Sequence, residues 1–334
     1  MALDLKNSGK YRDIEALGRL LKTAREERRL SRGDVGRWVS NEEKIRSLEE
    51  GKEGDFWEIR QVVGRLHIPS NMVSAYLNPQ DNALVNLELE IWYDLLFWRY
   101  GQAERKLQRF YGYCDRKNVA MMQSYYRLLA LFLVRQSRWE DQRTKELQDF
   151  IEKHMPNIEK SLWAREVFSP DELSLIAAYD RLVERKAEEC LKKLYSVVCY
   201  FRETFAREEH QHPFYAELIF ACAQELYRLG DYVNCVQQCM EGIKVTKYIR
   251  KSVVGGELYE LMADASGEML KKELTEKKLY VPDKGVTEQI DAVLDDYLCA
   301  DAQYSAFYFG YQDGHKEELE RKMKGWRTMT GHKS

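Results

Sequence analysis

The sequence predicts an all-α protein. Long stretches rich in Leu, Ala, Glu, Lys, Arg and Gln carry apolar residues at intervals of three and four, which is the spacing of one helix face. No convincing alternating run of Val, Ile and Thr indicates a strand. The six prolines all fall between these segments, as expected of a residue that interrupts helices, at positions 69, 79, 156, 170, 213 and 282.

Composition indicates a soluble protein of two or more domains. The chain has 334 residues, of which 44% are hydrophobic and 32% are charged, as is usual for globular proteins. No apolar run approaches the ~18 to 20 residues that span a bilayer, and the first residues lack the apolar region of a signal peptide. The seven cysteines are an odd number without the spacing of a disulfide framework. We therefore expect a cytoplasmic protein with reduced thiols and no membrane partner.

Three regions are predicted along the chain. The strip from 67 to 82 carries two prolines and three asparagines, so it predicts the end of one domain and a link to the next. The predicted boundaries are 1–80, 81–280 and 281–334, the last being a helical cap or a dimerisation segment. The net charge is −3, but residues 1 to 38 hold ten Lys and Arg against six Asp and Glu. Positive charge is thus concentrated at the N-terminus.

The N-terminal region predicts three short helices joined by tight turns. The first carries one apolar stripe, and the second is capped by Ser31 with Asp34. Asn41 can cap a third helix. The residues expected inside these helices are Leu17, Leu20, Leu21 and Ala24 in the first, Val35, Gly36, Trp38 and Val39 in the second, and Ile45 and Leu48 in the third. This order of short helices predicts a helix-turn-helix.

This segment resembles the repressor-type (XRE, Cro/C1) domain over residues 14 to 77. The matching residues are Leu17, Arg25, Glu26, Leu30, Ser31, Ile45, Leu48, Glu49 and Gly51. Two departures are a turn between the second and third helices that is one residue short, and the loss of its usual glycine. The resemblance implies binding to duplex DNA through Arg32, Asn41, Glu42, Glu43, Lys44, Arg46, Ser47 and Lys52.

The region after residue 80 predicts stacked helical hairpins. The segments ELEIWYDLLFWRYGQAERKLQRF and AELIFACAQELYRLGDYVNCVQQCMEGI share an aromatic-rich helix, a glycine turn and a second helix. The second segment resembles a tetratricopeptide repeat, with its turn at Leu229 to Tyr232 and Cys235 in the small-residue position. A right-handed superhelix of about five such hairpins is expected between 81 and 275, with a helix start at Ser169, Pro170 and Glu172.

The combination of these two parts resembles the peptide-pheromone regulators of Gram-positive bacteria, the Rgg, PlcR and PrgX group. The resemblance implies a homodimeric transcription regulator of quorum-sensing type that binds a short signalling peptide on its repeats. Independently, the first helix of each hairpin lines a groove, and aromatic and amide side chains there suit a peptide. The candidate peptide-binding residues are Arg127, Tyr179, Glu217, Phe220, Gln224 and Tyr227.

Enzyme and metal functions have little support in the sequence. Serine-hydrolase, phosphate-loop, dinucleotide-binding and zinc-protease motifs are all missing. Cys222, Cys235 and Cys239, with His210 and His212, suggest a metal site, but the thiols occupy helical positions that favour core packing. We therefore expect no cofactor and no metal. A repeat scaffold that binds a protein or peptide, and whose helix-turn-helix no longer binds DNA, remains as the alternative.

Overall fold

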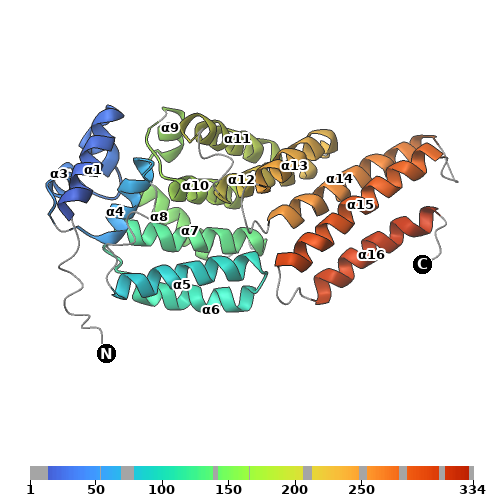
Figure 1. The fold of residues 1–334 in the computed structure, drawn as a ribbon, viewed down its shortest axis with the longest axis horizontal. Coiled ribbons are helices and arrows are strands. Elements are labelled where there is room, and N and C mark those ends of the chain that lie inside the picture. Colours follow the sequence, from blue (N-terminus) through green and yellow to red (C-terminus); the bar gives the residue numbers. More distant parts are fainter. Residues whose placement is uncertain are drawn as a thin grey trace. The chain divides into compact units, whose positions relative to one another are not determined.

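In the computed structural model the described residues are 14–52, 54–68, 79–137, 142–164, 166–205, 213–247, 254–277, 284–307 and 313–330. Over these ranges the chain is all-helical and contains no strand (Figure 1), which confirms the predicted fold class. The helices of these described ranges are α1 (Ile14–Glu27), α2 (Arg32–Gly36), α3 (Glu42–Glu49), α4 (Phe56–Arg65), α5 (Pro79–Leu96), α6 (Tyr100–Tyr113), α7 (Val119–Arg135), α8 (Gln142–His154), α9 (Ile158–Trp163), α10 (Pro170–Val183), α11 (Ala187–Thr204), α12 (Pro213–Arg228), α13 (Tyr232–Thr246), α14 (Val254–Lys277), α15 (Lys284–Phe307) and α16 (Asp313–Thr330).

The chain divides into two compact units, Met1–Val183 and Glu184–Ser334. Unit 1 contains α1 to α10, and unit 2 contains α11 to α16. The four N-terminal helices therefore belong to the same compact unit as α5 to α10. The boundaries near 80 and 280 stay predictions, and most of the strip from 67 to 82, residues 69 to 78, lies outside the described residues.

The predicted N-terminal caps are confirmed. Ser31 accepts a hydrogen bond from the backbone of Asp34, whose side chain bonds back to Ser31, and this capping box starts α2. Asn41 accepts from the backbone of Lys44 and starts α3. Because α1 packs on α3 and α2 packs on both α3 and α4, the four helices form one small bundle.

The predicted extent of the second helix was wrong at its C-terminal end. The helix α2 stops at Gly36, so Trp38 and Val39 lie in the turn that leads to α3. Trp38 has a φ of 60°, in the left-handed region that favours glycine. Trp38 therefore takes a conformation that a bulky side chain disfavours. Its ring packs on Phe168 with centroids 5.5 Å apart, a long-range contact that helps to hold the turn.

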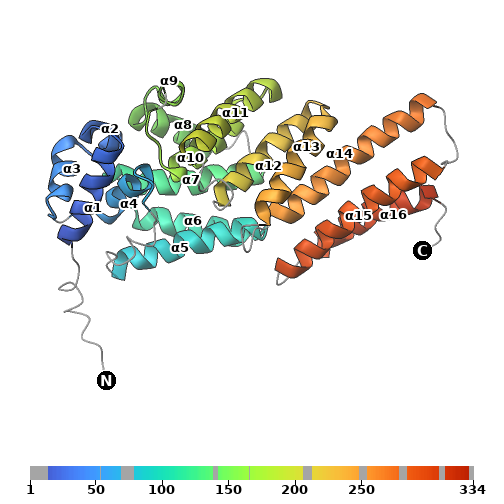
Figure 2. The same cartoon turned by 45° about the horizontal axis from the view of Figure 1, so that its top comes forward.

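Helices after α4 also pack on one another in unit 1. Figure 2 shows α5 beside α6, and these two helices are in contact. The expected glycine turn between them was wrong: Gly101 lies inside α6, and the turn is made by Phe97 to Arg99 with Trp98 at a φ of 53°. The helix α7 packs most extensively on α10, although α8 and α9 lie between them in sequence.

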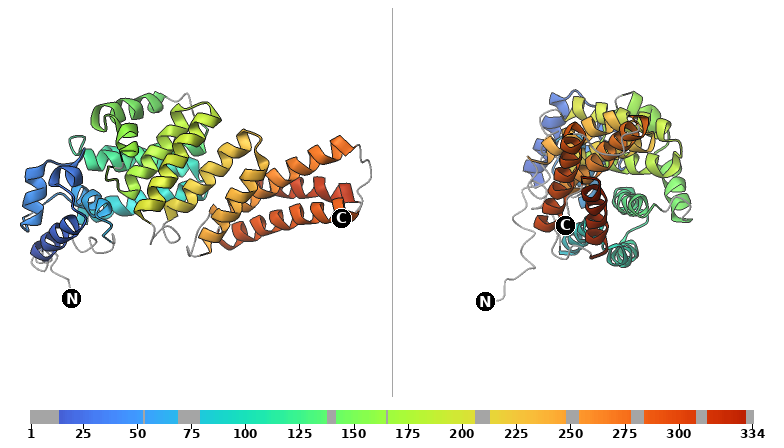
Figure 3. Two further views of the ribbon diagram at one scale, coloured as in Figure 1. Left: turned by 90° about the horizontal axis from the view of Figure 1, so that it is seen from above. Right: turned by 90° about the vertical axis from the view of Figure 1, so that its right-hand side faces the viewer.

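In unit 2 successive helices from α11 to α15 pack on one another, and Figure 3 shows α14 running beside α15. The predicted turn between α12 and α13 is confirmed. Gly230 has a φ of 73°, which favours glycine, and the side chain of Asp231 caps α13. Cys235 is fully buried, as expected of a small residue where two helices cross. The tetratricopeptide-like character of these pairs stays a prediction.

None of the helices in the described ranges combines the length and apolar character that crossing a membrane needs.

Candidate nucleic-acid interface and ligand-binding face

A buried ion pair fixes α3 against α1. Glu49 ends α3, and its carboxylate accepts hydrogen bonds from Arg25 of α1 and from Arg32 of α2, the latter at 2.9 Å from Nε to Oε2. The Glu49 side chain is only 3% exposed. Burial alone would raise the pKa of Glu49, but the hydrogen bonds from Arg25 and Arg32 hold it below its usual value. Glu49 therefore stays ionised and ties three helices together.

Glycines allow α1 and the end of α3 to approach closely. A Cβ on Gly18 of α1 would lie 2.6 Å from the carbonyl oxygen of Leu48. A Cβ on Gly51 would lie 2.8 Å from Cα of Glu15, and Gly51 has a φ of 75°. Position 51 therefore requires glycine, since only glycine suits both the backbone conformation and the space there.

The predicted DNA-binding residues lie on and around α3. The side chains of Asn41, Glu42, Glu43, Lys44, Arg46 and Lys52 are exposed, while Arg32 and Ser47 are half-buried. The exposed residues come from one short helix and its two ends. Such a helix in a helix-turn-helix can lie along the major groove of DNA. The role of these residues in DNA binding stays a prediction.

Every cation of this predicted interface has an acidic neighbour. Arg32 pairs with Glu49, Lys44 with Glu58 at 2.8 Å, Arg46 with Glu43 at 3.5 Å, and Lys52 with Glu50 at 2.7 Å. Arg46 and Lys52 pair with carboxylates that are exposed, so these two ion pairs are weak and exchangeable with a phosphate. Arg32 and Lys44 differ, because their partners Glu49 and Glu58 are buried, so both cations also have a structural role.

The helix α4 is anchored to α10 by charged and polar side chains. Arg65 and Glu172 form an ion pair with both side chains fully buried, and Arg65 also donates to the carbonyl of Val35 at 2.7 Å. Ser169 donates to Gln61 at 2.7 Å, and its hydroxyl and backbone complete the predicted capping box with Glu172. This confirms the predicted helix start.

Sequence reasoning found Ser169 and Glu172 as a helix start, but it missed Gln61 and Arg65, which anchor α4 to them. Arg65 and Glu172 are 107 residues apart, and Gln61 and Ser169 are 108 apart. No local pattern links partners at such separations. The one available signal is that α4 places Arg60 and Arg65 among apolar residues that are buried, where a lone cation is unfavourable.

The candidate peptide-binding residues of unit 2 share one face of α12. Glu217, Phe220, Gln224 and Tyr227 are spaced by three or four residues, and each is half-buried. Burial and then the carboxylates of Asp264 and Glu268 raise the pKa of Tyr227, so its hydroxyl lies near acidic groups of α14. The face combines aromatic, amide and carboxylate chemistry, which can bind an extended peptide.

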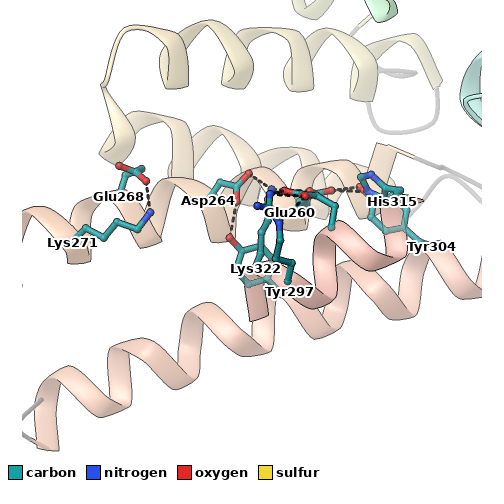
Figure 4. A network of polar contacts seen from close by, with 10 residues as sticks. Glu260, Asp264, Glu268, Lys271, Tyr297, Tyr304, His315 and Lys322 are labelled. Atoms are coloured by element: carbon teal, nitrogen blue, oxygen red, sulfur yellow. Dashed lines mark hydrogen bonds and ion pairs between the residues drawn. The ribbon is translucent and has the colours of Figure 1, made fainter. Parts of the chain in front are cut away.

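A polar network beside this face joins α14, α15 and α16 (Figure 4). Glu260 of α14 accepts hydrogen bonds from Tyr304 at 2.9 Å and Lys322 at 2.9 Å, and lies 3.1 Å from His315. Asp264 accepts from Tyr297 at 2.6 Å and from Lys322 at 2.8 Å. Burial opposes ionisation of Glu260, but His315 and Lys322 outweigh it and lower its pKa to about 2. The network fixes α16 to α14.

The two candidates in unit 1 lie on different helices. Arg127 of α7 pairs with Glu88 at 2.6 Å and with Asp171 at 3.4 Å. Tyr179 of α10 is half-buried. Their part in peptide binding stays a prediction.

The buried thiols lie in the helical core of unit 2. Cys222, Cys235 and Cys239 are each fully buried, and a hydrogen bond with Cys235, followed by burial, raises the pKa of Cys239. Within the described ranges no cluster of three His, Cys, Asp or Glu side chains is placed to hold a metal ion. His210 and His212 lie outside the described residues.

No protein-family model matches the chain, and no curated protein sequence is similar to it. Among solved structures, the chain is similar to PlcR of Bacillus thuringiensis in complex with the peptide PapR7 and DNA, with 13% identity, coverage of 93% of this chain and 99% of that one, and a TM-score of 0.48. It is also similar to the apo form of the competence regulator ComR from Streptococcus vestibularis, with 14% identity, coverage of 96% and 99%, and a TM-score of 0.46. Both scores describe a partial likeness, and function is therefore argued from this chain's own residues.

Proposed function

We propose that the chain is a transcription regulator that binds duplex DNA through α2 and α3 and is controlled by a short signalling peptide held by its helical hairpins. The observation that carries the proposal is the small bundle of α1 to α4. Two capped short helices are locked by the buried Arg25–Glu49 pair, and the second helix presents an exposed polar face. This is the arrangement that a helix-turn-helix uses to reach base edges.

The proposed assembly is a homodimer, which sedimentation velocity would test.

The DNA-binding half is tested by retardation of duplex DNA from upstream of the gene. The double variant Arg46→Ala, Lys52→Ala removes two exposed cations whose partners are also exposed, and it keeps Arg32 and Lys44, whose partners Glu49 and Glu58 are buried. Its affinity should fall, and the slope of log affinity against log salt should become less steep by about 1 to 2, because each phosphate contact contributes about 0.9. The matched control changes the exposed Lys145 and Lys153 of α8 to Ala. Equal losses in both variants would contradict the interface.

The scaffold alternative is favoured by one observation, namely that each cation of the predicted interface already neighbours a carboxylate. Such local neutrality reduces the attraction of DNA. Wild-type protein that retards no DNA even at low salt would support this alternative and remove the regulator proposal.

The peptide half is tested by isothermal titration with synthetic peptides from small reading frames beside the gene. Gln224→Ala and Tyr227→Ala should weaken binding at least several-fold, because both residues lie on the half-buried face of α12. Gln237→Ala, on the exposed side of α13, is the control. Absence of binding by the wild-type chain would contradict the sensor role and leave the DNA-binding half standing.

A further inference from the structure

A closed ring of four charges connects the N-terminal helices to the rest of unit 1. Arg60 of α4 pairs with Glu88 of α5 and, at 2.8 Å, with Asp171 of α10. Arg127 of α7 pairs with the same two carboxylates, at 2.6 Å and 3.4 Å. Two guanidinium groups therefore neutralise two carboxylates, and four helices meet at one point.

The ring is largely shielded from water. The side chains of Glu88 and Arg127 are 4% and 13% exposed. Burial lowers the pKa of Arg60 and of Arg127, but the neighbouring carboxylates outweigh burial and raise both. The electrostatic interactions among these four buried charges are strong, because water screens them little. Removal of one charge therefore leaves its partners uncompensated.

Arg127 still has a donor to offer. Its Nε–H has no hydrogen-bond partner among the described residues, and neither amide atom of Gln123 has one. Gln123 is 2% exposed and precedes Arg127 by four residues, so the two lie on the same face of α7. Buried polar atoms without partners are rare and call for a ligand or an ordered water. The Nε–H of Arg127 and the amide N–H groups of Gln123 are donors one helical turn apart, and they match a carboxylate of a peptide, which only accepts hydrogen bonds. The amide oxygen of Gln123 can accept from a backbone N–H of the same peptide.

We propose that Gln123 and Arg127 bind a carboxylate of the signalling peptide, and that Arg127 transmits this binding to α4 through the four-charge ring. The inference rests on the proposed function for the identity of the ligand. A carboxylate bound at Nε competes with Glu88 and Asp171 for the single charge of Arg127 and weakens both of its pairs, so Arg60 becomes the main guanidinium that neutralises the two carboxylates. The unbalanced negative charge favours separation of α5 from α10, which are the two helices that hold Arg60. The orientation of α4, and with it that of α3, becomes less restricted.

The ring is tested first without ligand, by amide hydrogen exchange of the full chain. Arg127→Gln imitates the loss of these two pairs and should speed exchange in α4 by about tenfold or more, with little change in α12 to α14 of unit 2. The double variant Glu88→Gln, Arg127→Gln restores neutrality and should return exchange in α4 most of the way to that of the wild type. Arg143→Gln is the control, since it breaks a half-buried pair with Glu104 elsewhere in unit 1.

The exchange rates in α4 show whether the four-charge ring restrains this helix. Unchanged exchange in α4, or a double variant that exchanges faster than the single one, would overturn the transmission step. If Arg127→Gln does not fold, Arg127→Lys keeps the charge but loses the two-sided pairing, and the same local increase in α4 is expected.

The ligand is tested with a pool of random seven-residue peptides, captured on the full chain and identified by mass spectrometry. The wild-type chain should capture members of the pool. Arg127→Gln should capture them at least about tenfold less, because hydrogen bonds to charged groups are strong. Methyl esterification of the peptide carboxylates should abolish this difference between wild type and variant. A captured peptide should also speed exchange in α4 of the wild type.

Two failures are distinguishable. Peptides that bind wild type and Arg127→Gln equally, or that leave α4 unchanged, overturn this inference and leave the proposed function intact. A wild-type chain that captures nothing contradicts the peptide-sensor function and the ligand step together, while the exchange experiment still decides whether the ring holds α4.

Discussion

At the scale of single residues, Gly51 occupies a position where both the backbone conformation and the space beside α1 require glycine. Replacing Gly51 by Ala should destabilise unit 1, by roughly 1 to 2 kcal/mol from the left-handed backbone alone and more from the contact with Cα of Glu15. Gly112 is the matched control, because it lies in α6 and a methyl group added there would meet no atom within 4 Å. Gly112→Ala should be neutral or stabilise by up to roughly 1 kcal/mol. Urea unfolding measures both, and equal effects would contradict the close approach.

The cysteines give a second prediction at this scale. Cys235 and Cys239 are fully buried where helices pack, and among the described residues no group of three His, Cys, Asp or Glu side chains is placed to hold a metal ion. Purified protein should therefore contain far less than one zinc per chain, as measured by elemental analysis. About one tightly held zinc, lost when Cys235 and Cys239 are changed to Ser, would show that the packing interpretation is wrong.

At the scale of elements, α16 is attached to α14 through ionised groups, which makes its attachment depend on pH. The pKa of Glu260 is about 2, below its usual value of 4.5, so the ionised form stabilises the fold. This contribution is complete above pH 4.5 and is lost as the pH falls from there towards 2. Glu260→Gln should therefore cost up to roughly 3 kcal/mol at pH 7 and much less near pH 3.

Chemical denaturation at both pH values checks this prediction. Glu268→Gln is the control on the same helix, because its partner Lys271 lies on α14 itself and the pair is partly exposed (Figure 4). A loss for Glu260→Gln that is the same at pH 3 and pH 7 would mean that hydrogen bonding, and not ionisation, holds α16.

The elements also show what the sequence can and cannot predict. Helix class and the caps at Ser31, Asn41 and Ser169 were predictable because caps are local and need specific side chains. The end of α2 and the turn after α5 were not, because Trp38 and Trp98 take left-handed conformations that their residue type disfavours. The four-charge ring could not be predicted either, since Arg60 and Asp171 are 111 residues apart. Of the candidate site, the exposure of α3 and the shared face of α12 were predictable, because both follow from helix periodicity.

At the scale of the whole molecule, two compact units predict more than one unfolding transition. Glu172→Gln leaves the buried guanidinium of Arg65 without its partner, so it should lower the midpoint of one transition by roughly 10 °C. Glu260→Gln should lower the midpoint of the other transition. Differential scanning calorimetry measures both midpoints. A single transition that both variants shift equally would mean that the chain unfolds as one cooperative body.

The buried pair of Arg65 and Glu172 also has a genetic consequence. Glu172 belongs to α10, yet its partner belongs to the bundle that carries α3. If α3 binds DNA as proposed, a screen for lost repression or activation should recover substitutions at Glu172 alongside those of the bundle itself. Second-site suppressors of Glu172→Leu should then appear at Arg65 as uncharged residues, because a buried apolar pair is far less costly than one buried charge without its partner.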